Sequence, residues 1–288
     1  MMKPRFGHEG APSANWADLT IPLLKSKAFA DGALQGLGAV FKFLMQTGLL
    51  LGAIALSPAL AGTQPPLRLC EQAAARLKAD SDLADAMRAA LGEPGVGHDE
   101  FCLYPLQLLR YADVDVLLTQ NLAPETACHG CTADLSAAVL RRIPGGFKHV
   151  RTFDAFGKTG TFGAVSSISP IAIGGDDGLA IESGGTFQGY TSVALDLYAF
   201  RRQGLVRVDA GGPLYLEGDD GGAQTDSTKA VSIDSAWSLA ANELVIDYRI
   251  SDSRGLRQTR AVWAVEDTRL TLKSGAIPKE MAHAVGSE

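Results

Sequence analysis

The fold is read most directly from residues 190–200, whose sequence is YTSVALDLYAF. Apolar side chains recur at every second position through Val193, Leu195 and Leu197, and this period turns one face of a β-strand toward a core. The same period returns at residues 243–250, ELVIDYRI. These segments predict that the chain is organised around antiparallel strands.

Short apolar segments bounded by Gly, Asp or Ser predict further strands in the second half of the chain: residues 161–168, 178–183, 205–209, 230–239, 258–266 and 270–273. Turns such as Asp177-Gly178 suit an antiparallel meander. The sequence contains no repeat of fixed period, which disfavours a propeller or a solenoid.

Two strand pairs are predicted further upstream. Alternating apolar residues across residues 106–118 indicate the first pair. Residues 135–143 and 147–153 flank a Pro-Gly-Gly turn, which predicts a hairpin, with a helix over residues 134–142 as the alternative.

A helical period precedes these strands. Apolar residues recur at spacings of three and four in residues 70–77 and again in residues 83–91, with Asp80 as a cap signal between them and Gly92 at the end. We therefore predict an α+β fold in which a short N-terminal helical segment packs on a large, mostly antiparallel β-sheet, arranged as a sandwich or a partly open barrel.

A signal peptide is indicated near the N-terminus. Lys42 precedes an uncharged apolar h-region at residues 43–56, and Ala59 and Ala61 fit the small-residue cleavage pattern. The alternative is a transmembrane anchor, because the 19 residues from 43 to 61 approach the ~20 that are needed to cross a bilayer.

The signal divides the chain into three parts. We expect residues 1–61 to be an N-terminal segment with the signal peptide, residues 62–276 to be a single exported domain, and residues 277–288 to be a disordered tail. The mature protein would be periplasmic or secreted, with no membrane contact after cleavage.

The whole chain has a formal net charge of −6 and a pI near 5.4. It contains no run of Lys and Arg that would neutralise phosphates, so a nucleic-acid partner is not expected. Removing residues 1–61 takes away five basic and three acidic residues, which leaves the exported part with a net charge of −8.

All four cysteines, Cys70, Cys102, Cys128 and Cys131, follow the predicted cleavage site. An even number of cysteines in an oxidising compartment predicts two disulfides. A bond between Cys70 and Cys102 would tie the helical segment to the strands, although the spacing leaves the pairing open.

The cluster Cys128-His129-Gly130-Cys131 is compatible with several kinds of chemistry. A structural disulfide that closes a four-residue turn, made possible by Gly130, is the leading interpretation. A redox-active pair would need a helix that starts at the first cysteine. Covalent haem is disfavoured because Thr132 stands where its histidine ligand would be.

A metal site is another interpretation of the same cluster. It would use Cys128, His129 and Cys131, with His98 or His149 brought near by folding. No second CxxC or HxxxH is present to complete a tetrahedral zinc site.

Two clusters, residues 174–178 and 217–222, combine carboxylates with Gly and are candidates for calcium. Neither has the spacing of an EF-hand, and acidic turns between strands are the simpler interpretation. Motifs for nucleophilic catalysis such as Gly-x-Ser-x-Gly do not occur. The sequence therefore favours a non-enzymatic protein and implies no cofactor.

The run GGTFQGYTS at residues 184–192 is the predicted binding surface. Its glycines allow close approach of the backbone, and Gln188, Tyr190 and Thr191 place hydrogen-bonding groups beside an aromatic face. The alternative is an ordinary hairpin with Tyr190 in the core.

Three motifs together resemble a loose group of uncharacterised exported bacterial proteins: CHGC at residues 128–131, GTFG at 160–163 and QGYT at 188–191. The resemblance covers roughly residues 104–200 and implies no particular activity. The prediction is an exported envelope protein that binds a small molecule, a glycan or an envelope protein. The alternative is a periplasmic thiol-redox or metal-handling protein that acts through Cys128 and Cys131.

Overall fold

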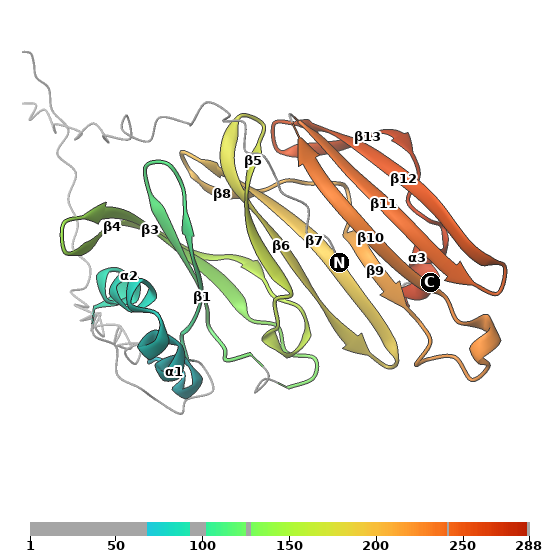
Figure 1. Cartoon of the computed structure of the whole chain (residues 1–288), viewed down its shortest axis with the longest axis horizontal. Helices are drawn as coiled ribbons and strands as arrows, with labels where there is room; N and C mark the ends of the chain where they lie inside the picture. Colours follow the sequence, from blue (N-terminus) through green and yellow to red (C-terminus); the bar gives the residue numbers. More distant parts are fainter. Residues whose placement is uncertain (1–67, 93–101, 125–127, 241, 287–288) are drawn as a thin grey trace, which may run out of the picture. The chain divides into compact units, whose positions relative to one another are not determined.

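The computed structural model describes residues 68–92, 102–124, 128–240 and 242–286. Within them the chain forms two antiparallel sheets and three short α-helices (Figure 1). The predicted fold class is confirmed, since the described residues are mostly antiparallel β-structure with few helices, and neither sheet closes on itself there.

The first sheet is a meander. Its four strands follow one another in order: β1 (Tyr104–Arg110), β2 (Asp115–Gln120), β3 (Asp134–Ile143) and β4 (Gly146–Lys158). The hairpin predicted across residues 144–146 is confirmed, and the alternative helix over residues 134–142 is wrong.

Two helices, α1 (Glu71–Ala79) and α2 (Ser81–Leu91), cover one face of this sheet. The side chain of Asp80 accepts a hydrogen bond from the amide of Leu83 at 3.0 Å, which caps α2 as its sequence predicts. Buried residues of the helices and of alternate strand positions form one core: Ala73, Leu83, Met87, Leu117 and Leu140.

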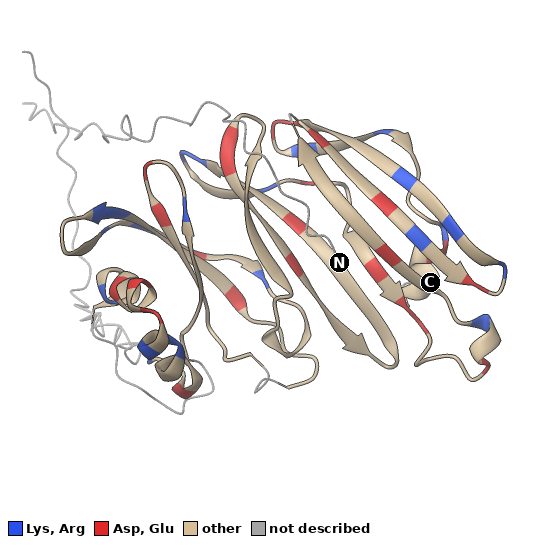
Figure 2. Ribbon diagram, viewed as in Figure 1, with Lys and Arg blue, Asp and Glu red and all other residues tan. Residues whose placement is uncertain are grey.

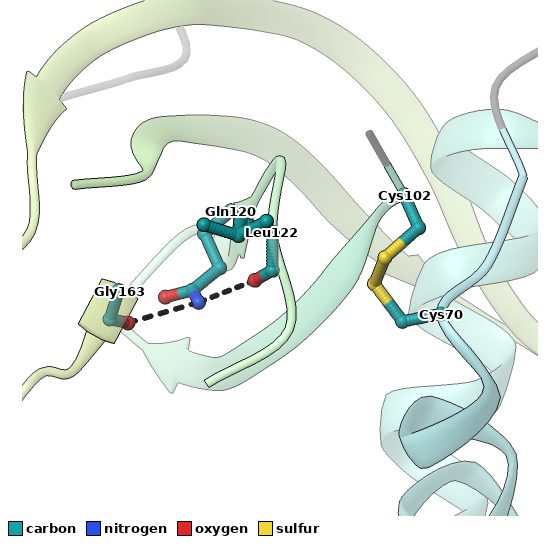
Figure 3. The surroundings of a disulfide bond; sticks show 5 residues. All are labelled: Cys70, Cys102, Gln120, Leu122 and Gly163. Carbon is teal, nitrogen blue, oxygen red and sulfur yellow. Dashed lines mark hydrogen bonds between the residues drawn. A yellow bond between two sulfur atoms is a disulfide. The ribbon is translucent and has the colours of Figure 1, made fainter. Parts of the chain in front are cut away.

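The first disulfide joins Cys70, at the start of α1, to Cys102, ahead of β1 (Figure 3). The two Cα atoms are 4.9 Å apart, and the bond spans 32 positions of sequence. Cys70 is fully buried and Cys102 is 7% exposed. The bond therefore lies inside the core between the helices and the sheet.

The second sheet contains nine strands: β5 (Ser167–Ile173), β6 (Asp176–Phe187), β7 (Tyr190–Arg201), β8 (Gly204–Arg207), β9 (Leu214–Asp219), β10 (Ser232–Ala240), β11 (Glu243–Asp252), β12 (Gly255–Glu266) and β13 (Arg269–Gly275). Their order is β13-β12-β11-β10-β9-β7-β6-β5, and β8 pairs with β7.

Away from their hairpin tip, strands β6 and β7 are largely buried on both faces and belong to two cores. One face packs on the first sheet through Leu179, Ile181 and Tyr198. The other face contributes Leu195 and Leu197 to the core that strands β9 to β13 share. The alternation seen in the sequence of β7 is thus confirmed, and its intervening aromatic positions are buried as well.

Three details of the second sheet differ from the predictions. No strand forms at the start of residues 161–168, because Phe162 adopts a positive φ of 57° within the short 3₁₀ turn η2 (Thr161–Gly163). The turn expected at Asp177-Gly178 lies at Gly174-Gly175, whose φ angles are 62° and 83°. Strand β9 is not predicted from the sequence, because Glu-Gly-Asp at its end resembles a turn.

The expectation of a disordered tail over residues 277–288 is wrong for residues 277–286. Helix α3 (Glu280–Ala284) forms there, and its Met281 and Ala284 side chains are buried against β9. A β-carbon on Gly218 of β9 would lie 2.9 Å from that of Ala284, so the glycine permits this contact.

The predicted signal peptide, with its h-region at residues 43–56, lies outside the described residues, and the boundary at residues 61 and 62 stays a prediction. Among the helices that the structure describes, none has the length and apolar character to cross a membrane.

Candidate functional site

The second disulfide, Cys128–Cys131, closes an exposed turn. Its Cα atoms are 5.0 Å apart, and the amide of Cys131 donates to the carbonyl of Cys128 at 2.9 Å. The prediction of two disulfides is therefore confirmed. The role expected of Gly130 is wrong, because its φ is not positive and a β-carbon there would meet no atom within 4 Å.

Strand β3, rather than a helix, follows this turn. A thioredoxin-type cysteine has its thiol pKa lowered by the N-terminus of a helix, and no helix of the described chain begins at this turn. Because the sulfurs of Cys128 and Cys131 are bonded to each other, neither is a thiolate ligand in this form.

The other members of the predicted metal site do not complete it. His149 lies on β4, where its Nε2 is 2.9 Å from Oγ1 of Thr152, and His98 lies outside the described residues. Across the part of the chain that the structure describes, no group of three His, Cys, Asp or Glu side chains is placed to hold a metal.

The GTFG motif at residues 160–163 lies directly beside the disulfide turn. The amide of Gly163 donates to the carbonyl of Cys131 at 3.0 Å. The fully buried Gln120 donates from Nε2 to the carbonyl of Gly163 at 3.0 Å and to that of Leu122 at 2.5 Å (Figure 3). Gln120 therefore fixes the motif at the end of β2.

The same motif packs against the glycine-rich run. Oγ1 of Thr161 donates to the carbonyl of Gly184 at 3.4 Å. A β-carbon on Gly185 would overlap Oγ1 of Thr161, and one on Gly160 would overlap the backbone of Gly184. Glycine is thus needed on both sides, because the two backbones approach within the space that a side chain would occupy.

The glycine-rich run forms the tip of the β6–β7 hairpin. Gln188 and Gly189 make its two-residue turn with φ angles of 52° and 89°, the left-handed pair that matches the twist of the strands. Phe187 pairs across this turn with Tyr190, and Gly185 pairs with Ser192. These four positions lie on one face of the hairpin, to which the side chains of Phe187, Tyr190 and Ser192 point.

A cavity of about 390 Å³ lies on this face. It is lined by residues from four separate parts of the chain: Thr132, Gly160, Thr161, Ser183, Gly184, Gly185, Phe187, Gln188, Tyr190, Ser192, Val285 and Gly286. Of these lining residues none is charged, and Figure 2 shows the hairpin tip without Lys, Arg, Asp or Glu.

An aromatic row, made of Phe162, His129 and Phe187, runs from the GTFG motif to the edge of the cavity. His129 meets Phe162 edge to face with ring centroids 4.8 Å apart, and it stacks on Phe187 at 6.0 Å and 21°. Phe187 is 55% exposed. The disulfide turn therefore carries a ring that supports the cavity's aromatic edge.

Two of the three predicted binding residues line the cavity. Gln188 and Tyr190 do so. The run does form a hairpin, as the alternative expected, but Tyr190 is half-buried and does not lie in the core. Thr191 points to the other face of the hairpin, where its Oγ1 is 2.8 Å from Oγ1 of Thr186.

The sequence interpretation misses the C-terminal wall of the cavity, formed by Val285 and Gly286. A β-carbon on Gly286 would lie 3.0 Å from the ring of Tyr190, so the wall sits directly on the ring. A signal for it was present, since Ile277, Met281 and Ala284 have helical spacing.

Ion pairs attach the helix that leads to this wall. Glu280 accepts hydrogen bonds from Arg254 at 2.6 Å and from Arg257 at 3.1 Å, and both guanidinium groups also bind Asp252. The hydrogen bond from Arg254 holds the pKa of Asp252 well below its ordinary value, against the opposite effect of burial.

The second predicted calcium cluster, residues 217–222, lies beside α3. Asp220 is fully buried and accepts from the amide of Val231 at 2.6 Å and from Gln224 at 2.9 Å, while His283 of α3 lies 3.3 Å from it. Asp219 accepts from the amide of Gly221. These carboxylates therefore serve as turn and helix supports in the described structure.

Comparisons with protein-family models, with curated proteins and with solved structures found no match to the chain.

Proposed function

We propose that this protein is an exported, non-enzymatic binding module whose ligand occupies the cavity at the tip of the β6–β7 hairpin. The observation that carries the proposal is that separate segments of the chain meet at one place. The motifs at residues 128–132, 160–163 and 184–192 and the C-terminal wall at 285–286 are far apart in sequence and meet around one cavity. A volume of about 390 Å³ falls within the ~300–1,000 Å³ of small-molecule pockets.

Export is supported by the two disulfides and by the predicted signal peptide. Periplasmic or secreted protein would begin after Ala61, and mass spectrometry of the protein recovered from the envelope and from the medium measures that start. Recovery of full-length chain in the membrane fraction alone would contradict cleavage and favour the anchor.

The binding function is tested by ¹H–¹⁵N NMR of the protein against a library of metabolites and oligosaccharides. We expect a binder to shift the amide signals of residues 160–163, 184–192 and 286 together. Thr132→Trp, which places a large side chain at the cavity edge, should abolish these shifts, while Thr271→Trp on exposed β13 should not. Binders that shift only other residues, or none at all, would reject the proposal.

The thiol-redox alternative is favoured by one observation, the exposure of Cys128. Equilibration with thiol buffers of known potential distinguishes the two functions. A midpoint for Cys128–Cys131 above about −300 mV would support a cycling thiol, whereas a lower value is expected of a structural bond. Zinc analysis of the reduced protein tests metal handling in the same samples.

A further inference from the structure

The lining of the cavity restricts the ligand's charge. Charged residues make up 20% of the chain, yet none of the described residues that line the cavity carries a charge. An ionic ligand would give up its hydration there without gaining a counter-charge. The net charge of −8 that the exported part would carry adds repulsion for an anion approaching the protein.

The polar groups of the lining restrict the ligand's chemistry. Hydroxyls come from Thr132, Ser183, Tyr190 and Ser192, and an amide comes from Gln188. A hydroxyl both donates and accepts hydrogen bonds, and an amide side chain does the same through separate atoms. The best partner for such a set is a molecule that also carries many groups able to donate and accept, as a polyhydroxylated ligand does.

The aromatic row provides an apolar surface beside these polar groups. Phe187 is 55% exposed and lies in the lining, and one side of it is supported by the stacked ring of His129. The rings of Phe162, His129 and Phe187 pack on one another, so they do not surround an open space as the cage for a quaternary ammonium does. A single flat ring face suits a ligand with a flat apolar side.

From the uncharged lining, its hydroxyls and the exposed ring, we infer that the ligand is a neutral saccharide. One sugar ring stacks its C–H face on Phe187, and its hydroxyls bond with Gln188, Tyr190 and Ser192. The inference rests on the proposed function, because it names the ligand class of the same cavity.

The first test is an array of neutral and acidic glycans probed with the full protein, followed by calorimetric titration of the strongest neutral binder and of hexagalacturonate. A neutral oligosaccharide should bind, shift the amides of residues 160–163 and 184–192, and exceed hexagalacturonate in affinity by about ten-fold or more. Spermidine, as a cationic probe, should leave these amides unshifted.

Variants of the aromatic edge give the second test. Phe187→Ala should lower the affinity for the neutral oligosaccharide by about ten-fold, and Phe187→Tyr should retain it. The matched control is Leu256→Ala, which removes an apolar side chain that is 65% exposed at the start of β12 and should leave affinity unchanged. Because Phe187 is exposed, the NMR signals of the other strands should remain in place.

The outcomes separate the inference from the function on which it rests. If the cavity binds charged or apolar library members but no neutral glycan, the saccharide inference is overturned and the binding function stands. If neutral glycans bind with equal affinity to wild type and Phe187→Ala, the inference is also overturned. If nothing binds at the cavity, both proposals fail.

Discussion

The two disulfides of this protein have nearly the same geometry, with Cα separations of 4.9 and 5.0 Å, yet they act on different scales. Cys70–Cys102 spans 32 positions and is buried between helices and sheet, whereas Cys128–Cys131 spans three positions on the surface. The contribution of each disulfide to the structure therefore depends on the length of the loop that it closes and on the packing around it.

The chain-entropy model gives this contrast a magnitude. Closing a loop of 33 residues stabilises the folded state by roughly 3–4 kcal/mol, whereas closing one of four residues contributes about 2 kcal/mol. The first bond also fixes the start of α1 on the first sheet. The second bond instead presents His129 to Phe162 and Phe187 beside the cavity.

Removing each disulfide in turn is the largest test of the comparison. The double substitution Cys70→Ala with Cys102→Ala should lower the free energy of unfolding by about 3–4 kcal/mol, and the pair Cys128→Ala with Cys131→Ala by about 2 kcal/mol or less. Denaturant titration measures both. The affinity for the neutral ligand should fall more in the second double variant than in the first, because only the Cys128–Cys131 pair supports the aromatic row.

The comparison would be broken if the surface pair proved the more destabilising. Each double variant removes both sulfurs of a pair, so no unpaired thiol is left to form a new bond. A denaturation slope that matches the wild type ensures that the same surface is exposed on unfolding in each protein.

Gln120 links the regions of the two disulfides. It lies on β2, in the sheet to which the first disulfide attaches α1, and it binds the GTFG motif beside the second disulfide. Gln120→Ala leaves the carbonyls of Leu122 and Gly163 without their buried donor, which should cost about 2–3 kcal/mol. Gln258→Ala, on the exposed face of β12, should stay within about 0.5 kcal/mol. Equal losses in the two variants would show that these buried hydrogen bonds are not stabilising.

Reduction of the folded protein sharpens the contrast in exposure. Cys128 is open to solvent, while Cys70 is fully buried. With dithiothreitol under native conditions, Cys128–Cys131 should be reduced about ten-fold faster or more than Cys70–Cys102. Alkylation at timed intervals and peptide mass spectrometry give both rates. Equal rates would mean that the core between α1 and β1 opens as readily as the surface turn.

The sequence predicted best what depends on neighbouring residues. The alternation in β7 and β11, the Asp80 cap and the pairing of Cys128 with Cys131 all follow from local spacing. These features need no knowledge of which distant segments meet. Their local causes therefore sufficed.

The cavity could not be predicted in the same way, because it depends on register and on distant contacts. The turn at Gln188-Gly189 sets the pairing of Phe187 with Tyr190, and a shift of one residue exchanges the faces of the hairpin. For this reason Ser192 lines the cavity and Thr191 does not. The meeting of Thr161 with Gly185 is likewise invisible in either segment alone.

The ion pairs that attach α3 depend on pH, whereas the two disulfides do not titrate. The pKa of Asp252 is lowered in the folded state, so its stabilising effect is present above the unfolded value of about 4 and is lost as the pH falls below it. Between pH 6 and pH 3 the wild type should lose more free energy of unfolding than Asp252→Asn. Parallel curves for the two proteins would exclude this contribution.

The smallest expected effect is a difference in stability between substitutions at two glycines near the second disulfide, Gly163 and Gly130. Gly163 has a φ of 61°, whereas Gly130 has no positive φ and has open space where a β-carbon would lie. Gly163→Ala should cost about 1 kcal/mol in conformational strain, and Gly130→Ala should stay within about 0.5 kcal/mol. Denaturant titration measures both variants. If Gly130→Ala were the more costly, the surface turn would be under a constraint of its own, and the view of it as a local support for His129 would be wrong.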